Sequence, residues 1–212
     1  MSRLARAGLG LLLFILVNGR QALGAEQSEP VYLEKPLGAW VADLRHRDHA
    51  VRYDAAMALG AIGKPAIPSL LTALKSTDPE VRIVAATGLG RIGPDAKVAV
   101  APLINALKDK DRDVRRKAAE ALGGIGPAAR AAIPPLIEAL DDLDITASYS
   151  PAADALGRIG KASVEPLFGA LRSDDRIVRR MATVALTAIG SEAKAAVPAL
   201  RRASRPTRPS CG

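Results

Sequence analysis

The side chains that most often carry out catalysis are scarce in this sequence. His46 and His49 are the only histidines, and neither adjoins a cysteine or an obvious nucleophile. The single cysteine, Cys211, has no second cysteine with which to form an intramolecular disulfide. No glycine-rich loop of the phosphate-binding type is present. We therefore predict no catalytic residue, no metal site and no cofactor, and we expect a binding protein rather than an enzyme.

Aspartate and arginine, by contrast, recur four times in the pattern Asp-x-x-Val-Arg. An aspartate just before a helix can accept hydrogen bonds from free N–H groups and oppose the positive end of the helix dipole. The arginines could bind anions, but an acid accompanies each of them, which favours pairing with an aspartate of the same or the next turn. We interpret the set as a structural ladder, made of Asp48, Arg52, Asp78, Arg82, Asp111, Arg115, Asp175 and Arg179.

Two flanking motifs predict the helices that hold this ladder. An apolar quartet at i, i+3, i+4 and i+7 precedes each aspartate turn and marks one face of a first helix, helix A. The segment Ala-Leu-Gly-x-Ile-Gly, or a variant of it, ends a second helix, helix B. Its closing glycine suits a left-handed residue, and its inner glycine indicates a close helix crossing. The closing glycines are Gly63, Gly93, Gly126, Gly160 and Gly190; the inner glycines are Gly60, Gly90, Gly123 and Gly157.

The motifs repeat with a period of 30 to 34 residues. Each unit reads as helix A, an aspartate turn, helix B and a glycine loop. A single helical hairpin cannot bury its apolar face, so neighbouring units must stack into one core. We place a linker at 25–36 and units at 37–66, 67–99, 100–132, 133–163 and 164–196. A capping helix follows at 197–204, in which Arg201 and Ser204 replace apolar positions.

Residues 78–93 (DPEVRIVAATGLGRIG) and 111–126 (DRDVRRKAAEALGGIG) resemble the HEAT-like repeats named after phycobilin (PBS) lyases. The resemblance covers about 37–204. It implies an all-α fold, a right-handed α-solenoid of about five HEAT-like helical hairpins plus a terminal capping helix, with helix B on the concave face. It is specific for fold rather than function, because such repeats serve lyases, hydroxylases and scaffolds alike. A hydroxylase of this kind would need His-Glu iron ligands, and the sequence has no His-Glu dipeptide.

The outward positions of helix B form the candidate binding surface. Ile83, Val84, Met181 and Val184 are apolar although we assign them no place in the core. With the basic residues of the third unit, they predict a mixed patch able to bind a protein. The alternative is that scattered apolar surface residues have no function. The predicted partner-binding residues are Tyr53, Met57, Ile83, Val84, Thr87, Arg91, Arg116, Lys117, Glu120, Asp154, Arg158, Arg180, Met181 and Val184.

The fourth unit breaks the pattern. Ser148 and Tyr149 stand where the other units have Val-Arg, and the stretch from Asp141 to Pro151 is acidic and longer. Ser150-Pro151 predicts a new N-cap and first helical residue, which would shorten helix B. The acidic spacing matches no calcium-binding loop. Function and neutral drift both remain open for this segment.

The two ends of the sequence suggest targeting. Arg3 and Arg6 precede the apolar run 7–17, which is too short to span a bilayer but fits the core of a signal peptide. We predict a signal peptide at 1–24, cleavage near Gly24-Ala25 and export to the periplasm or the extracellular space; an N-terminal membrane anchor is the alternative. The tail, 205–212, is basic. Contact with an anionic surface could be made through Arg201, Arg202, Arg205 and Arg208.

The net charge of +8 comes mostly from these ends, so the body between residues 25 and 200 is nearly neutral. A neutral body argues against nucleic-acid binding. We expect a monomeric exported scaffold that binds a protein through its concave face. An envelope-associated protein held by its basic tail is one alternative. A phycobilin-lyase-like enzyme is another, less favoured because those lyases act inside the cell.

Overall fold

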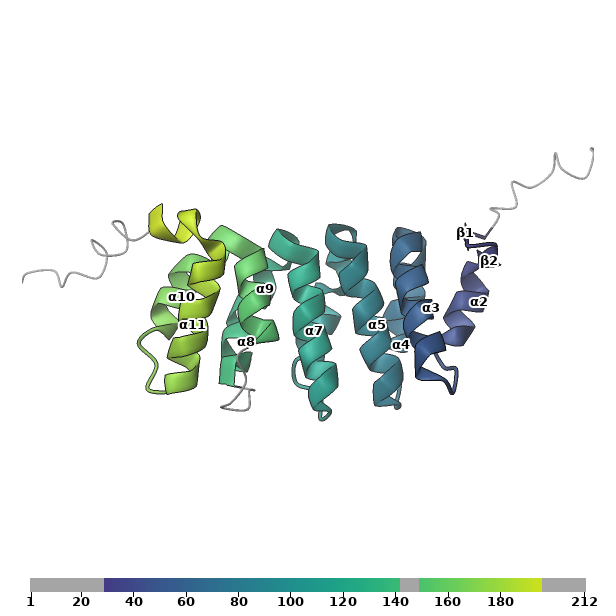
Figure 1. Cartoon of the computed structure of the whole chain (residues 1–212), viewed down its shortest axis with the longest axis horizontal. Coiled ribbons are helices and arrows are strands. Elements are labelled where there is room, and N and C mark those ends of the chain that lie inside the picture. The colour runs from purple at the N-terminus through teal and green to yellow at the C-terminus, as the bar shows by residue number, and fades with distance from the viewer. Residues whose placement is uncertain (1–28, 142–148, 196–212) are drawn as a thin grey trace, which may run out of the picture.

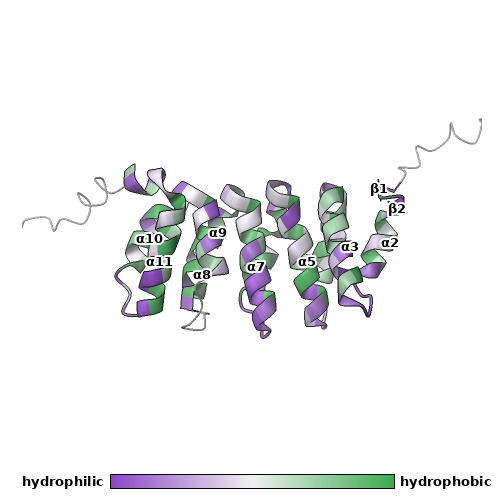
Figure 2. Cartoon of the chain, viewed as in Figure 1, coloured by the Kyte–Doolittle hydropathy of each residue, from purple (hydrophilic) through white to green (hydrophobic). Residues whose placement is uncertain are grey.

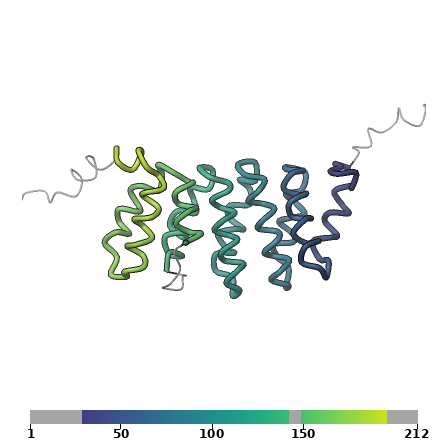
Figure 3. The backbone as a smooth tube through the Cα atoms, viewed as in Figure 1, coloured from purple at the N-terminus to yellow at the C-terminus, as the bar shows by residue number. Residues whose placement is uncertain are grey.

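The computed structural model describes residues 29–141 and 149–195. Its helices form a row of hairpins in two layers, with helices B in front in the view of Figure 1. The tube in Figure 3 shows that the described chain begins and ends at opposite ends of the row. The predicted α-solenoid is therefore confirmed. The predicted signal peptide, capping helix (197–204) and basic tail lie outside the described residues.

The helices A begin at the residues with which the predicted units begin, and each stands beside its own helix B. Helices A are α2 (Leu37–Asp43), α4 (Ile67–Ala73), α6 (Val100–Ala106), α8 (Ile133–Glu138) and α10 (Val164–Ala170). Helices B are α3 (His49–Ile62), α5 (Pro79–Ile92), α7 (Arg112–Ile125), α9 (Pro151–Ile159) and α11 (Arg176–Ile189). Short 3-10 helices join or extend them: η1 (Lys64–Ala66), η2 (Gly93–Ala99), η3 (Gly126–Ala132), η4 (Ala139–Asp141) and η5 (Gly160–Ser163).

Each helix B ends at its closing glycine for a conformational reason. The five closing glycines have φ between +68° and +80°. Their ψ values, near −140° in the first four, lie outside the left-handed helical region and in a region essentially restricted to glycine. The prediction of positive φ is therefore confirmed, although the conformation is more extended than that of a typical left-handed cap.

The core is a continuous stack along the row. One leucine from each of the first four helices B is fully buried at the same repeat position, namely Leu59, Leu89, Leu122 and Leu156. Alanines fill much of the remaining interior. Small side chains let the helices approach closely, so the units stack at short spacing.

The segment 31–36, which the sequence analysis assigns to a linker, forms a small antiparallel hairpin of β1 (Val31–Tyr32) and β2 (Lys35–Pro36). Leu33 and Glu34 at its tip both have positive φ. The Trp40 Nε1–H donates to the Tyr32 carbonyl oxygen at 3.1 Å, and the Lys35 ammonium lies 4.1 Å from the Trp40 ring centroid. The hairpin is thereby held against α2 at the N-terminal end of the row.

Candidate protein-binding site on the helix-B face

The ladder aspartates cap the helices B. The Asp48 and Asp78 carboxylates each accept a hydrogen bond from a first-turn N–H at 2.9 Å. Asp111 accepts two such bonds, from the Asp113 and Val114 N–H groups, and Asp175 also accepts two. Each cap satisfies donors that have no partner within the helix. These aspartates therefore mark the starts of the helices B.

The ladder arginines instead close the aspartate turns. Arg52, Arg82, Arg115 and Arg179 each donate to two backbone carbonyl oxygens, five and six residues earlier, at 2.7 to 3.3 Å. Among the described residues, Arg52 and Arg82 also reach a carboxylate of the following unit. The Arg52 Nη2 lies 3.0 Å from Glu80 Oε2. The expected pairing with an aspartate of the next turn therefore holds for Arg82, whose partner is Asp109, whereas Arg52 pairs with a glutamate of the next unit.

The Arg82–Asp109 pair, which links the second and third units, is more buried than the Arg52–Glu80 pair. Arg82 donates to both carboxylate oxygens of Asp109, at 2.7 and 2.8 Å, and the two side chains are only 9% and 14% exposed. Burial raises the pKa of Asp109, but the hydrogen bonds from Arg82 and from the Asp111 N–H, with the Arg82 charge, outweigh burial and lower the pKa below 3.8. The pair is therefore ionised and structural near neutral pH.

Two of the predicted surface residues are in the core. Val84 and Met181 are each 1% exposed. The prediction that they point outward is wrong, because a helix B inside the row contacts its own helix A and also the helices B on one or both sides. Val84 lies on α5, which packs against α3, α4 and α7. Contacts with several neighbouring helices bury more of the circumference of a helix B than the single apolar face that periodicity identifies.

The other predicted residues are exposed or half-buried in the helix-B layer, and we name the surface they form the helix-B face. It comprises Tyr53, Met57, Ile83, Thr87, Arg91, Arg116, Lys117, Glu120, Asp154, Arg158, Arg180 and Val184. Tyr53 and Val184 are 47% and 44% exposed. Figure 2 shows hydrophilic residues over the N-terminal half of α7, in the middle of this face.

The structure brings five of these residues together in one groove across α5, α7 and α9, which we name the central groove. Its volume is about 620 Å³, part of it open to solvent. Its floor consists of the small residues Ala86, Gly90, Ala121 and Gly124. Its walls are Thr87, Lys117, Glu120, Tyr149, Asp154 and Arg158. Tyr149 is the wall residue that the predicted partner-binding set lacks.

The floor is flat because α5 and α7 touch through glycine. A Cβ added to Gly90 would lie 2.7 Å from the Ala121 Cα, and one added to Gly124 would overlap the Gly90 carbonyl oxygen. The expectation that inner glycines permit a close helix crossing is confirmed here. The absence of side chains at these positions leaves room above the two helices for part of another molecule.

The charged groups in the walls are paired within their own helices. Lys117 Nζ lies 2.6 Å from Glu120 Oε2 on α7, and Arg158 Nε lies 2.8 Å from Asp154 Oδ2 on α9. All four side chains are about one third exposed or more, so the pairs contribute little to stability. Two cations and two anions also leave the groove electrically balanced, with polar groups of both signs facing solvent.

Tyr149 stands between these pairs and is 52% exposed. Burial raises the pKa of its hydroxyl, and the nearby Asp154 and Glu120 carboxylates raise it further. The phenol therefore stays protonated and able to donate a hydrogen bond at physiological pH. Tyr149 departs visibly from the repeat in the sequence. Its position beside residues of α7 becomes apparent only in the structure.

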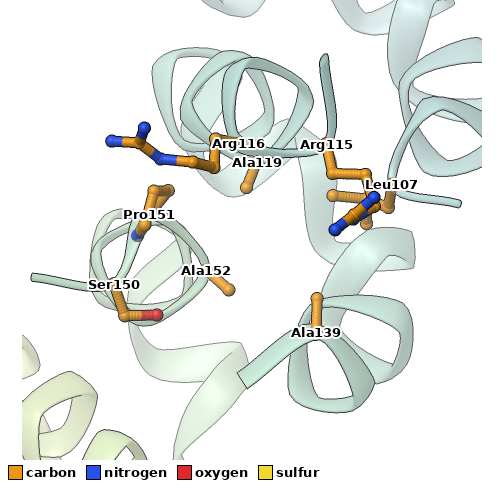
Figure 4. Close-up of a pocket in the computed structure, with 8 residues that line it drawn as sticks. All are labelled: Leu107, Arg115, Arg116, Ala119, Ala139, Ser150, Pro151 and Ala152. Atoms are coloured by element: carbon orange, nitrogen blue, oxygen red, sulfur yellow. The ribbon is translucent and has the colours of Figure 1, made fainter. Parts of the chain in front are cut away.

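Tyr149 can line the central groove because α9 is short and begins only after it. Ser150 caps α9 by accepting from the Ala153 N–H at 3.2 Å, and Pro151 is its first residue, as predicted. The helix has nine residues where α7 has 14. A pocket of about 290 Å³, part of it open to solvent, lies beside the two helices. Figure 4 shows residues that border it, among them Arg115, Ala119, Ala139 and Ala152.

Across residues 29–141 and 149–195, no three His, Cys, Asp or Glu side chains are grouped closely enough to hold a metal ion. Within the same ranges, no helix is both long and apolar enough to cross a membrane.

Comparison with known families identifies the repeat. The family described as HEAT repeats matches residues 67–149 and 149–209, and the PBS lyase HEAT-like repeat matches 51–76. The chain belongs to the HEAT-repeat family. The suspected kinship with PBS-lyase-type HEAT-like repeats is therefore confirmed, and this HEAT-repeat protein has the scaffold fold typical of protein-binding repeats. A search of curated proteins found no match.

Several solved structures are similar to this HEAT-repeat protein. The complex of CpcE and CpcF of phycocyanin lyase from Nostoc sp. PCC7120 is 24% identical, with a TM-score of 0.56, over 70% of this chain and 96% of that chain. An engineered protein is 28% identical, with a TM-score of 0.48, over 78% and 85%. The archaeal HEAT-like repeats protein from Thermococcus onnurineus NA1 is 17% identical, with a TM-score of 0.42, over 72% and 70%. The lyase complex shows a shared fold and carries no activity over to this chain.

Proposed function

We propose that this HEAT-repeat protein is an exported scaffold that binds a partner protein through the helix-B face, with the central groove as the main contact. The observation that carries the proposal is the convergence of three helices B on that groove. An exposed aromatic ring, a glycine floor and polar groups of both signs meet there. Aromatic anchors surrounded by polar groups are typical of protein-binding surfaces.

The described wall residues form no ion pair between units, which supports a binding role. Their ion pairs join residues three or four apart on one helix and connect no two units. The ladder, by contrast, uses Arg52 and Arg82 to connect successive units. A partner is expected to recognise the groups that the stack itself does not need.

A capture experiment tests the binding surface. Immobilised protein is exposed to extract of the native host, and the retained proteins are compared for wild type, Tyr149→Ala, Arg158→Glu and the control Arg130→Glu. Arg130 is exposed on η3, outside the helix-B face. We expect one protein to be retained by wild type and by the control and to be lost from both groove variants. Equal retention by all four proteins would rule the central groove out.

Salt separates this proposal from attachment through the basic tail. Contacts made by Arg201, Arg202, Arg205 and Arg208 should vanish at high ionic strength, because exposed charges are screened. A contact centred on Tyr149 and the groove floor should largely persist. Loss of all retention in high salt, with groove variants behaving like wild type, would favour an envelope-associated protein held by its tail.

Export is proposed from the N-terminal sequence, where two arginines precede an apolar run and small residues precede Ala25. N-terminal sequencing of the protein isolated from fractionated host cells tests it. We expect a first residue at or near Ala25 in the periplasmic or extracellular fraction. An intact N-terminus in the membrane fraction would support the anchored alternative instead. Lyase activity is not proposed, because the likeness to the phycocyanin lyase complex concerns the fold alone.

A further inference from the structure

Two arginines of the helix-B face differ from the buried Arg82 in the donors that they leave free. In Arg82, Nε and Nη2 bind Asp109, and Nη1 binds two backbone carbonyl oxygens. Arg158 contacts Asp154 through Nε alone, so its two Nη groups have no partner among the described residues. Within residues 29–141 and 149–195, the guanidinium of Arg91 pairs with no carboxylate. The free donors of an arginine fork match the two oxygens of a carboxylate.

The stems of both arginines lie against a glycine on the preceding helix B. A Cβ added to Gly60, on α3, would lie 2.7 Å from the Arg91 Cδ. One added to Gly123, on α7, would lie 3.4 Å from the Arg158 Cδ. Both arginines are exposed, so the stems are held on the helices while the charged ends stay in water.

The two arginines hold the same repeat position, since each directly follows the inner glycine of its unit. The unit between them has Gly124 there, on the floor of the central groove. Helices pack about 8–10 Å apart, so two helix spacings place the guanidinium groups about 16–20 Å apart. An extended chain advances about 3.3 Å per residue and covers this separation in about five or six residues.

We propose that the partner binds through an extended acidic segment, with carboxylates about six residues apart that contact Arg91 and Arg158. This inference rests on the proposed function of the central groove and adds the chemistry of the partner. The segment crosses α7 over the floor, where the small residues leave room for a main chain. The Tyr149 hydroxyl and the Lys117 ammonium face the groove and can donate to carbonyl oxygens of that main chain.

The groove walls favour an acidic protein segment over a nucleic acid. Glu120 and Asp154 both line the groove. A nucleic acid carries a phosphate on every nucleotide, so some of its charges would face these two carboxylates and be repelled. A protein segment can place neutral residues opposite Glu120 and Asp154 and keep its own carboxylates for the two arginines.

Rigid probe peptides test the chemistry and the spacing. Two glutamates separated by five prolines stand about 19 Å apart, because a polyproline helix rises about 3.1 Å per residue. The labelled peptide is titrated with the full chain at low ionic strength and followed by fluorescence anisotropy. One comparison peptide has glutamine in place of both glutamates, and the other has its two glutamates adjacent. We expect the spaced acidic peptide to bind at least about tenfold more tightly than the glutamine peptide and about threefold more tightly than the adjacent one.

Substitutions show where the peptide binds. Arg91→Gln and Arg158→Gln should each weaken binding of the spaced peptide about tenfold, whereas the control Arg130→Gln, outside the helix-B face, should leave it unchanged. Circular dichroism confirms that the helices persist in each variant. Equal affinity for the spaced and the glutamine peptides would overturn the inference. Binding that neither arginine variant weakens would also overturn it, by assigning the acidic peptide to another basic region such as the tail.

Two further outcomes keep this inference separate from the proposed function. A single-stranded oligonucleotide that binds more tightly than the spaced peptide, and through the same two arginines, would replace the acidic segment by a nucleic acid. A partner that is captured by wild type, lost from Tyr149→Ala and retained by Arg91→Gln would leave the proposed function standing and refute the acidic segment. The carboxylate contacts are weakened by salt, whereas contacts of a whole partner with Tyr149 and the groove floor are not.

Discussion

The contacts on the two sides of α7 differ although the same repeat builds both. Toward α5, Gly90 lies against Ala121, and Arg82 reaches Asp109 across the unit boundary. Toward α9, the facing helix is five residues shorter, a pocket of about 290 Å³ that is partly open to solvent lies beside it, and Tyr149 just before the helix is exposed. We name the contact between α5 and α7 the sealed joint and the contact between α7 and α9 the open joint. The two differ in the length of the second helix B rather than in core composition.

The two joints expose different groups to a binding partner. A sealed joint presents little except backbone and methyl groups, since its small residues serve the crossing of the helices. The open joint frees side chains from packing, and the central groove combines both kinds, with its floor on the sealed side and Tyr149 and Asp154 on the open side. A departure from the repeat in one unit thus supplies the specific groups, and the regular units supply a rigid base for them.

The largest expected effect concerns the sealed joint. Arg82→Leu should lower the free energy of unfolding by about 3–5 kcal/mol, because the Asp109 carboxylate would be left largely buried without its partner. Denaturant unfolding measures the loss. Arg52→Leu is the matched control, and it should cost clearly less because its partner Glu80 is 45% exposed. Equal losses in the two variants would mean that burial of the pair does not matter.

The same pair makes stability depend on pH. The pKa of Asp109 is lowered in the folded protein, so its stabilising contribution is complete above the ordinary value of 3.8 and is lost as the pH falls through the folded value. Arg82→Leu removes the hydrogen bonds and the charge that lower the pKa of Asp109, while burial still raises it. The pKa of Asp109 should therefore rise in this variant. Carboxyl titration by NMR measures both values. An unchanged pKa of Asp109 in the variant would contradict the assigned cause.

The next effect on stability distinguishes a glycine at the contact between α5 and α7 from a glycine with open space around it. Gly124→Ala should destabilise the protein by about 2 kcal/mol: the overlap with the Gly90 carbonyl costs about 3 kcal/mol, and alanine's helix propensity recovers about 1 kcal/mol. Gly169→Ala, on α10 with no atom within 4 Å of the added Cβ, should stabilise by about 0.5–1 kcal/mol. Thermal and chemical unfolding of both variants test the difference in sign. A stable Gly124→Ala protein would mean that α5 and α7 separate easily.

A smaller effect is expected at the open joint. Ala152→Leu should cost about 1 kcal/mol less than the same change at a sealed position, because its side chain borders the pocket beside α7 and α9, which is partly open to solvent. Ala118 holds the equivalent place on α7 and is 0% exposed, so Ala118→Leu should cost about 1–3 kcal/mol. Both variants are compared by denaturant unfolding. Similar costs at the two positions would show that the pocket does not provide usable space.

The smallest effect leaves stability almost unchanged and concerns the central groove. Asp154→Asn and Glu120→Gln should each lower the pKa of Tyr149, because burial and these two carboxylates raise it. Ultraviolet titration in a background of Tyr32→Phe and Tyr53→Phe isolates the Tyr149 phenol. Arg130→Gln serves as the control, because this exposed residue on η3 does not line the groove. A pKa of Tyr149 that responds to neither carboxylate would place the ring elsewhere.

Much of the fold could be predicted from the sequence, because unit boundaries depend on local signals. Asp111 and Ser150 mark helix starts through their own hydrogen bonds, and the closing glycines mark helix ends through their own backbone angles. The hairpin at 31–36 was not predicted. Its tip residues, Leu33 and Glu34, adopt positive φ without glycine or asparagine, so no common turn signal is present.

The site was harder to predict, because it depends on which units touch and from how many sides. Periodicity identifies one buried face per helix, so it assigned Val84 to the surface although neighbouring helices bury it. The partners of Arg52 and Arg82 lie in the following units at positions that differ relative to the ladder aspartate. Glu80 comes two residues after Asp78, and Asp109 two residues before Asp111. Spacing within one unit cannot reveal such pairs.

The shortness of α9 has a mechanical consequence for the whole protein. A stack linked only between neighbours behaves like a zipper, whose opening starts at the least cooperative joint. The joint between α7 and α9 has a pocket beside it, and it divides three units from the last two. A partner seated in the central groove would span this joint from α5 to α9. Binding would then act as a splint, which holds the first three units and the last two in one fixed arrangement.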